Sequence, residues 1–303
     1  MICHRLKTHP HLGDHVILTG AVRNVRLARP DIHFVPTAEY GEVWNGNPDV
    51  HDIDAGGFFL RIEERGVDYG TVMEERFGSN GTCVEGFTKV LCSILGIEQV
   101  PLVHNAPILY LTEEEIEWGT QFEDAIVLNS NCQTSTLSKG YPHWQRVVDS
   151  LKGERIVQVG GNLDKDLTMD LRGVEDWRGK TSIRQLFAMI HGCRLVVSPP
   201  SSFSNIAGAF AKKQLVLNGS READVLTGYE GAVHFSRKSK CQGIPDLGAW
   251  GIDCGCVSLG TKGFRTCPMA GGEYVERDGR HWCRCMWDIK PHDISRRIKE
   301  LLV

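Results

Sequence analysis

Three loops of small and polar residues could bind phosphate. They are residues 160–162, 198–204 and 218–221, and each follows a short apolar run typical of a strand. Glycine and serine let a phosphate approach the backbone closely, and the first N–H groups of a following helix attract anions. One such loop could be a plain turn, but three together predict a nucleotide site. The candidate contacts are Gly160, Ser201, Ser202, Asn205 and Gly219.

The segment 9–15 carries an acid and several histidines. Asp14 follows a glycine where a helix is expected to begin, and the helix dipole at that position favours an ionised carboxylate. It could serve as a general base or simply cap the helix, and its position alone leaves both interpretations open. His9, His11 and His15 lack the helical spacing and acidic partner of a metal site, so we expect solvated loop histidines.

Six of the eleven cysteines lie in the last quarter of the chain. The Cys-x-Cys pairs Cys254 with Cys256 and Cys283 with Cys285 could supply four thiolates to a structural zinc ion. Their spacing differs from the common C-x2-C, so reduced thiols that stabilise a C-terminal lobe are the alternative. Neither interpretation gives these cysteines a role in catalysis.

Several well-known nucleotide and hydrolase motifs are missing from the sequence. It contains no G-x-x-x-x-G-K-[ST] segment and no G-x-G-x-x-G after an early strand, which argues against a P-loop enzyme and a dehydrogenase. The G-x-S-x-G elbow of many hydrolases is also missing. A phosphate site here must therefore be of another type.

The elements that would position these residues alternate between strands and helices, which is typical of parallel sheets. Apolar runs predict strands at 32–35, 125–128, 156–159, 195–197 and 215–217. Periodic apolar residues predict helices from near residue 14, at 84–95, 144–151, 182–192, 205–211 and 291–302. Ser182 and Gln185 have capping-box spacing, and Gly96 and Gly192 stand where helix ends are expected.

Length and composition favour two ordinary domains. The chain has 303 residues, of which 41% are hydrophobic and 24% charged. We expect domains at 1–120 and 121–303, joined through the proline-containing acidic stretch 100–117. The net charge of -4 gives no overall positive field for nucleic acid. Without a signal-like or membrane-spanning apolar stretch, a cytoplasmic location is expected.

The order of these segments resembles the heptosyltransferase-like glycosyltransferases of family 9. LGDHVILTGAVRNVRLARPDIHFV is similar to the family's Gly-Asp segment with its helix and second strand, and NPDVHDID to the N-P-x-V step after it. SKGYPHWQRVVDSL resembles the K-x-W-P segment, with Tyr141 in place of tryptophan. The resemblance then continues nearly to the end through RIVQVGG, DWRGKTSIRQLFAMI, LVVSPPSSFSNIAGAFAKKQLVLNGS, LTGY and CRCMWDIKPHDISRRIKELL.

This resemblance implies a GT-B fold of two facing Rossmann-like domains, followed here by a cysteine-rich C-terminal segment and a terminal helix. It implies that Asp14 is the general base and that Lys139 contacts the donor phosphates. The implied reaction is an inverting hexosyl or heptosyl transfer that needs no metal cofactor. A nucleotide-sugar donor would supply the sugar to an acceptor hydroxyl, in surface glycan or lipopolysaccharide synthesis.

One loop departs from the family pattern. Pro200 and Asn205 stand where the family's D-[ST]-G-x-x-H loop has aspartate and histidine. The departure keeps two alternatives open, namely a non-catalytic GT-B protein that binds sugar nucleotides or glycans, and a nucleotide-sugar epimerase. The acceptor also stays open among a glycan, a lipid-linked group, another hydroxyl and a nucleic-acid base.

Overall fold

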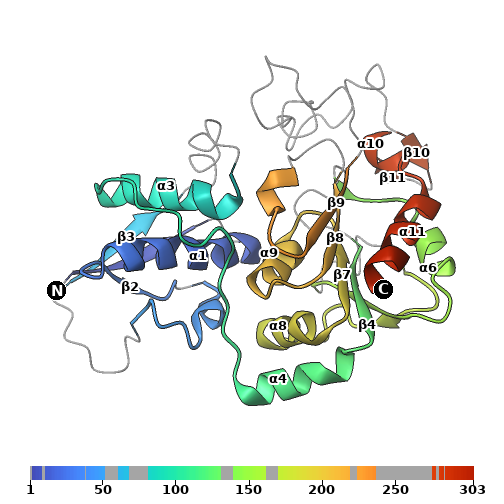
Figure 1. The fold of residues 1–303 in the computed structure, drawn as a ribbon, viewed down its shortest axis with the longest axis horizontal. Coiled ribbons are helices and arrows are strands. Elements are labelled where there is room, and N and C mark those ends of the chain that lie inside the picture. The colour runs from blue at the N-terminus through green and yellow to red at the C-terminus, as the bar shows by residue number, and fades with distance from the viewer. Residues whose placement is uncertain are drawn as a thin grey trace.

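The computed structural model shows two α/β parts, each built around its own parallel sheet (Figure 1). The described residues are 2–8, 11–37, 39–51, 61–67, 81–130, 139–161, 170–218, 224–236, 275–277, 280–282 and 284–303. The predicted α/β class with parallel sheets is confirmed.

The first sheet has the order β2-β1-β3 among the described strands. Its central strand β1 (Ile2–Lys7) pairs in parallel with β2 (His33–Val35) and β3 (Arg61–Gly66). Helices α1 (Leu12–Ala28) and α3 (Cys83–Leu95) pack against each other. The short helix η1 (Gly41–Trp44) also contacts α1.

The second sheet has the order β6-β5-β4-β7-β8-β9, and all its strands are parallel. The strands are β4 (Ala125–Asn129), β5 (Arg155–Val159), β6 (Glu175–Asp176), β7 (Leu195–Ser198), β8 (Gln214–Asn218) and β9 (Ala232–Ser236). The chain builds outward from β4 in one direction and then from β7 in the other. Such a reversal of strand order opens a ligand site outside the carboxyl ends of the two strands.

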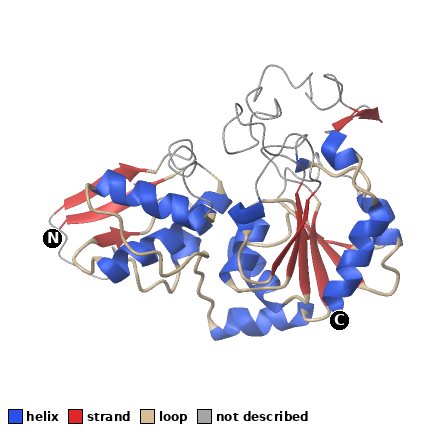
Figure 2. Cartoon of the chain, turned by 45° about the horizontal axis from the view of Figure 1, so that its top comes forward, coloured by secondary structure: helices blue, strands red, loops and turns tan. Residues whose placement is uncertain are grey.

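Alternate residues of β4 face opposite sides of the second sheet. Ile126 and Leu128 belong to a core with α6 (Trp144–Asp149) and α11 (Pro291–Leu302), whereas Val127 faces the core that includes α8 (Ile183–Gly192). Helices thus cover both faces (Figure 2), which explains why these strands are apolar throughout rather than alternating with polar residues.

The remaining described elements are short. The chain passes between the sheets through α4 (Glu113–Gly119) and η2 (Thr120–Phe122), and α9 (Ser202–Ala209) follows β7. The others are η4 (Asp224–Thr227), β10 (Val275–Arg277), β11 (Arg280–Trp282) and α10 (Arg284–Trp287). No helix of the described part is long and apolar enough to cross a membrane.

Helix α8 confirms one predicted end and corrects the other. The capping box between Ser182 and Gln185 is present. Gly192, however, is still helical, has no positive φ, and is followed by Cys193 as the C-cap. Its lack of a side chain matters because a Cβ there would lie 2.1 Å from the carbonyl oxygen of Gly119. Close packing of α4 on α8 therefore requires the glycine, rather than helix termination.

We expect Gly192→Ala to lower the free energy of unfolding by roughly 1–3 kcal/mol, because the backbone of α4 must move to admit the methyl group. Helix propensity alone predicts the opposite sign, a gain of up to about 1 kcal/mol. Urea unfolding distinguishes the two. Gly41→Ala is the control, since a Cβ at that position would meet no atom within 4 Å.

Of the late cysteines, only Cys285 lies among the residues described for their burial. It is buried beside Met286 in the core that α6 and α11 share. Cys254, Cys256 and Cys283 lie outside the described residues, so the zinc hypothesis stays a prediction. Among the described residues, no group of three or more His, Cys, Asp or Glu side chains is placed to hold a metal ion.

Candidate active site

The loop after β7 and the start of α9 form a polar surface at the carboxyl edge of the second sheet. Ser201 is the N-cap of α9, and the Ser204 hydroxyl accepts from its N–H at 3.0 Å and donates to its carbonyl at 2.7 Å. Within the described chain, the buried hydroxyls of Ser198 and Ser201 have no hydrogen-bond partner. Together with the first N–H groups of α9, these hydroxyls suit an anionic ligand.

The end of β4 supplies polar groups that the sequence reasoning missed. Asn129 and Ser130 are buried, and the Asn129 Oδ1 atom has no partner among the described residues. The Ser130 hydroxyl accepts from Gln158 Nε2 at 3.0 Å. Because the strand order reverses between β4 and β7, these residues and the 198–201 loop border the same ligand position. Polar residues at the end of a fully buried strand and directly after it were the available signal.

Lys139 lies beside the polar loop that follows β7. Its Nζ donates to the carbonyl oxygen of Pro200 at 2.8 Å, immediately before the N-cap of α9. The ammonium group and the positive end of the α9 dipole therefore occupy the same region. The structure thus brings Lys139 to Ser201 and Ser202, although about 60 residues separate them in the sequence.

The first turn of α1 meets the first turn of α9 across the two parts of the molecule. A Cβ on Gly13 would lie 3.3 Å from Asn205 Nδ2 and 3.4 Å from the Cα of Ser202. The hydroxyl of Tyr229 donates to Asn205 Oδ1 at 3.0 Å, which directs the amide NH2 toward α1. Asn205 is therefore held at the junction between the parts, next to the residue that precedes Asp14.

Asp14 is buried at this junction, with 8% of its surface exposed. It occupies the third position of α1, whereas His11 is the N-cap, so Asp14 is not a helix cap. Burial raises the pKa of its carboxyl group to about 7, and the positive charge of Lys139 partly opposes this. Only the helix dipole, which favours the ionised carboxylate, was considered from the sequence, whereas burial favours the neutral acid.

His15 also differs from the sequence prediction. It is a buried residue of α1 rather than a solvated loop histidine. Its Nδ1 lies 3.1 Å from the Thr37 hydroxyl, whose own proton goes to the carbonyl of Glu39 at 2.5 Å. His15 must then donate from Nδ1. Burial lowers its pKa to about 4, so the ring is neutral at pH 7.

Of the two remaining predicted contacts, Gly160 lies away from this junction and Gly219 is not among the described residues. Gly160 directly follows β5, and its carbonyl accepts from the N–H of Gly179 at 2.8 Å. Because β5 is two strands from β7, Gly160 lies at the same sheet edge but about 10 Å from the 198–201 loop, given the usual strand spacing.

The fold matches solved glycosyltransferases along nearly its full length. A family 9 glycosyl transferase from Veillonella parvula DSM 2008 superposes with a TM-score of 0.63 at 14% identity, covering 99% of this chain and 97% of that one. For E. coli ADP-heptose LPS heptosyltransferase II the TM-score is 0.61 at 13% identity, with 100% and 98% covered. For E. coli heptosyltransferase WaaC with ADP it is 0.52 at 14% identity, with 78% and 93% covered.

At these identities the likeness shows a GT-B-like α/β fold with two parallel sheets, similar to that of family 9 heptosyltransferases. No protein-family model matches the chain, and the search of curated protein sequences finds no match.

Proposed function

We propose that this protein is an inverting glycosyltransferase that moves a sugar from a nucleoside diphosphate sugar to an acceptor hydroxyl. The observation that carries the proposal is the pairing of two unlike groups at one junction. Asp14 is a carboxylate with a pKa near 7 on one part of the molecule, and Lys139 with the α9 N-terminus forms a positive region on the other. An acid–base group opposite an anion site is what sugar transfer from a diphosphate needs.

In the proposed reaction, Asp14 accepts the proton of the acceptor hydroxyl. The oxygen of that hydroxyl attacks the anomeric carbon of the donor sugar at the same time. The bond from that carbon to the diphosphate oxygen breaks, and the electron pair leaves with the diphosphate. Lys139 and the first N–H groups of α9 stabilise the charge on the leaving group. These groups supply the positive charge themselves, so the proposal requires no metal ion.

The donor we expect first is an ADP-linked sugar. Two observations support this choice, namely the fold shared with E. coli heptosyltransferase WaaC, which was solved with ADP, and the polar groups at the sheet edge where β4 and β7 end. For the acceptor we favour a surface glycan such as the lipopolysaccharide core, because E. coli heptosyltransferase II is an LPS enzyme.

The proposal predicts that ADP stabilises the protein more than AMP does, because the β-phosphate reaches Lys139 and α9. A ligand at 100 times its Kd raises the free energy of unfolding by about 2.7 kcal/mol, which a thermal-shift series over ADP, UDP, GDP and AMP can measure. Inorganic pyrophosphate controls for general charge effects. If every nucleotide leaves the melting temperature unchanged, no donor site exists and the proposal fails.

A second assay separates transfer from mere binding. Slow release of free sugar from the stabilising donor, in the absence of acceptor, identifies a catalyst and excludes the non-catalytic binder. An isomerised nucleotide sugar would instead identify an epimerase. With an acceptor present, NMR of the product's anomeric proton should show inversion, and retention would contradict the single-displacement mechanism.

A further inference from the structure

The chain between the two sheets is attached firmly to the first part as far as residue 108. Asn24 Oδ1 accepts from the N–H groups of Val103 and His104 at 3.1 and 2.8 Å. The Thr19 hydroxyl accepts from the N–H of Ile108 at 2.9 Å. These side chains belong to α1, so residues 103–108 must move together with the first part.

From Glu113, the first residue of α4, the chain is attached to the second part. Thr112 and Glu115 form the capping box that begins α4, and α4 packs on α8. The packing is close, because a Cβ on Gly119 would lie 2.3 Å from the carbonyl oxygen of Ala188. Only residues 109–112 connect these two attached stretches.

One side chain spans this short connection. Arg184 of α8 donates from Nε to Glu115 Oε1 at 2.7 Å and forms a second hydrogen bond with Oε2 of the same carboxylate. Its Nη2 also donates to the Tyr110 carbonyl at 2.7 Å, and its Nη1 donates to the Glu42 carbonyl of η1 at 3.1 Å. Arg184 therefore joins the second part, the connection and the first part.

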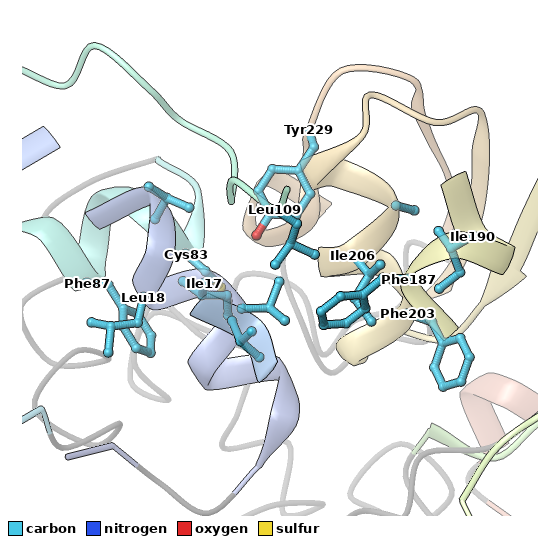
Figure 3. Close-up of a cluster of buried hydrophobic side chains, with 14 of the residues drawn as sticks. Ile17, Leu18, Cys83, Phe87, Leu109, Phe187, Ile190, Phe203, Ile206 and Tyr229 are labelled. Carbon is cyan, nitrogen blue, oxygen red and sulfur yellow. The ribbon is translucent and has the colours of Figure 1, made fainter. Parts of the chain in front are cut away.

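The interface between the described portions of the two parts also contains apolar contacts. Figure 3 shows apolar side chains from both parts at the interface, among them Ile17 and Leu109 from one and Phe187 and Ile206 from the other. The hydrophobic effect is not directional, so it constrains the angle between the parts less than hydrogen bonds do. A pocket of about 480 Å³ also separates residues 103–108 from the end of α9 at 208–211, which leaves room for rotation.

We infer that residues 109–112 are the hinge between the two parts and that Arg184 is the clasp that holds them at the observed angle. The hinge precedes residue 120, so α4 moves with the second part. Since Asp14 and Lys139 lie on different parts, Arg184 is a positioning residue for the proposed transfer. Only this last consequence rests on the proposed function, because the hinge and clasp are properties of the fold.

Arg184→Lys tests the clasp, because lysine keeps the charge beside Glu115 but lacks the planar fork that reaches three groups. Hydrogen exchange followed by mass spectrometry should show roughly tenfold faster exchange in peptides covering 40–45 and 109–112. Small-angle scattering should show a larger radius of gyration. The matched control is Arg155→Lys, since Arg155 binds Asp124, Glu175 and the Gln121 carbonyl within the second part.

The control should leave exchange in both peptides unchanged. An even rise in exchange over the whole chain of Arg184→Lys, or none at 40–45 and 109–112, would overturn the clasp. These readouts need no substrate, so they stand whether or not the transfer proposal holds. If it holds, Arg184→Lys should lower kcat while ADP affinity stays within about twofold of wild type, because the phosphate contacts lie within the second part.

Discussion

Asp14→Asn should lower sugar transfer by about 100-fold to 10,000-fold, the usual cost of removing a general base. Asparagine has the same shape but accepts no proton at neutral pH. Affinity for ADP should change little, because the phosphate groups would sit against Lys139 and α9 on the other part. Initial rates and ADP titrations on the same preparations measure both. Turnover close to wild type would remove Asp14 from the mechanism.

The pH dependence of transfer gives an independent check on the same residue. The base works only when deprotonated, and its pKa is about 7. Wild-type kcat should therefore rise with pH through about 7 and level off above it. A profile that is already flat from pH 5 would mean that the ionisation of Asp14 does not limit the reaction.

Asp14→Asn should raise the free energy of unfolding at high pH, although it lowers turnover. The folded pKa of about 7 lies above the ordinary value of 3.8, so the fold favours the neutral acid and loses stability as pH rises from about 4 to 7. The shift corresponds to a penalty on the order of 4 kcal/mol. Asp14→Asn should thus be more stable than wild type at pH 8 and nearly equal to it at pH 4.

Asp49→Asn is the matched control. Asp49 is another buried acid of the first part, but it is paired with Arg23 at 2.9 Å. Breaking that pair should lower stability at pH 8 while turnover per folded molecule stays unchanged. At pH 8, Asp14→Asn should therefore be more stable and less active than wild type, whereas Asp49→Asn should be less stable and equally active. A general effect on folding would not produce this pattern.

Elements with strong local signals could be predicted from the sequence alone. The capping box at Ser182, the αL glycine at Gly96 and the apolar stripe of α11 each act within a few residues of the chain. Local chemistry of this kind determines where a helix begins or ends. The strands of the second sheet were predictable for a related reason, since burial on both faces requires unbroken apolar runs.

Strand β1 was missed because its formation depends on partners. The segment Ile2–Lys7 contains several basic residues and no clear alternation, yet it is the central strand between β2 and β3. Neighbouring strands decide such cases more than residue preference does. Gly192 is a similar case. Its spacing in the sequence suggested a residue that ends a helix, but the need for a glycine comes from close packing against Gly119.

The chemistry of the candidate site was only partly predictable, for the same reason. Asp14 was a candidate from its position and from the resemblance, Lys139 from the resemblance, and Ser201, Ser202 and Asn205 from their loop. The pKa of Asp14 depends on its burial and on Lys139, which comes from a distant part of the chain. The buried hydrogen bond between His15 Nδ1 and the Thr37 hydroxyl likewise joins residues that are far apart in the sequence.

Lys139→Ala should weaken ADP binding by about 10-fold to 100-fold, because hydrogen bonds to charged groups contribute roughly 1.5–3 kcal/mol. The lysine is held at Pro200 beside the α9 N-terminus. Its removal takes away the side-chain positive charge that we propose to contact the phosphates. The loss should be smaller at high ionic strength, since salt already screens the attraction in wild type. Isothermal titration at two salt concentrations measures both effects.

The best control for Lys139→Ala is Lys212→Ala. Lys212 also donates from a partly buried Nζ to a backbone carbonyl, that of Cys193 at 2.8 Å, but it lies after α9 rather than at its start. Both variants should lose similar stability, whereas only Lys139→Ala should lose ADP affinity. The positive charge of Lys139 also lowers the pKa of Asp14, so its removal should shift the midpoint of the kcat profile to higher pH. Equal ADP affinity in the two variants would show that the phosphate groups do not lie beside Lys139, and the donor would then have to bind elsewhere on the second part.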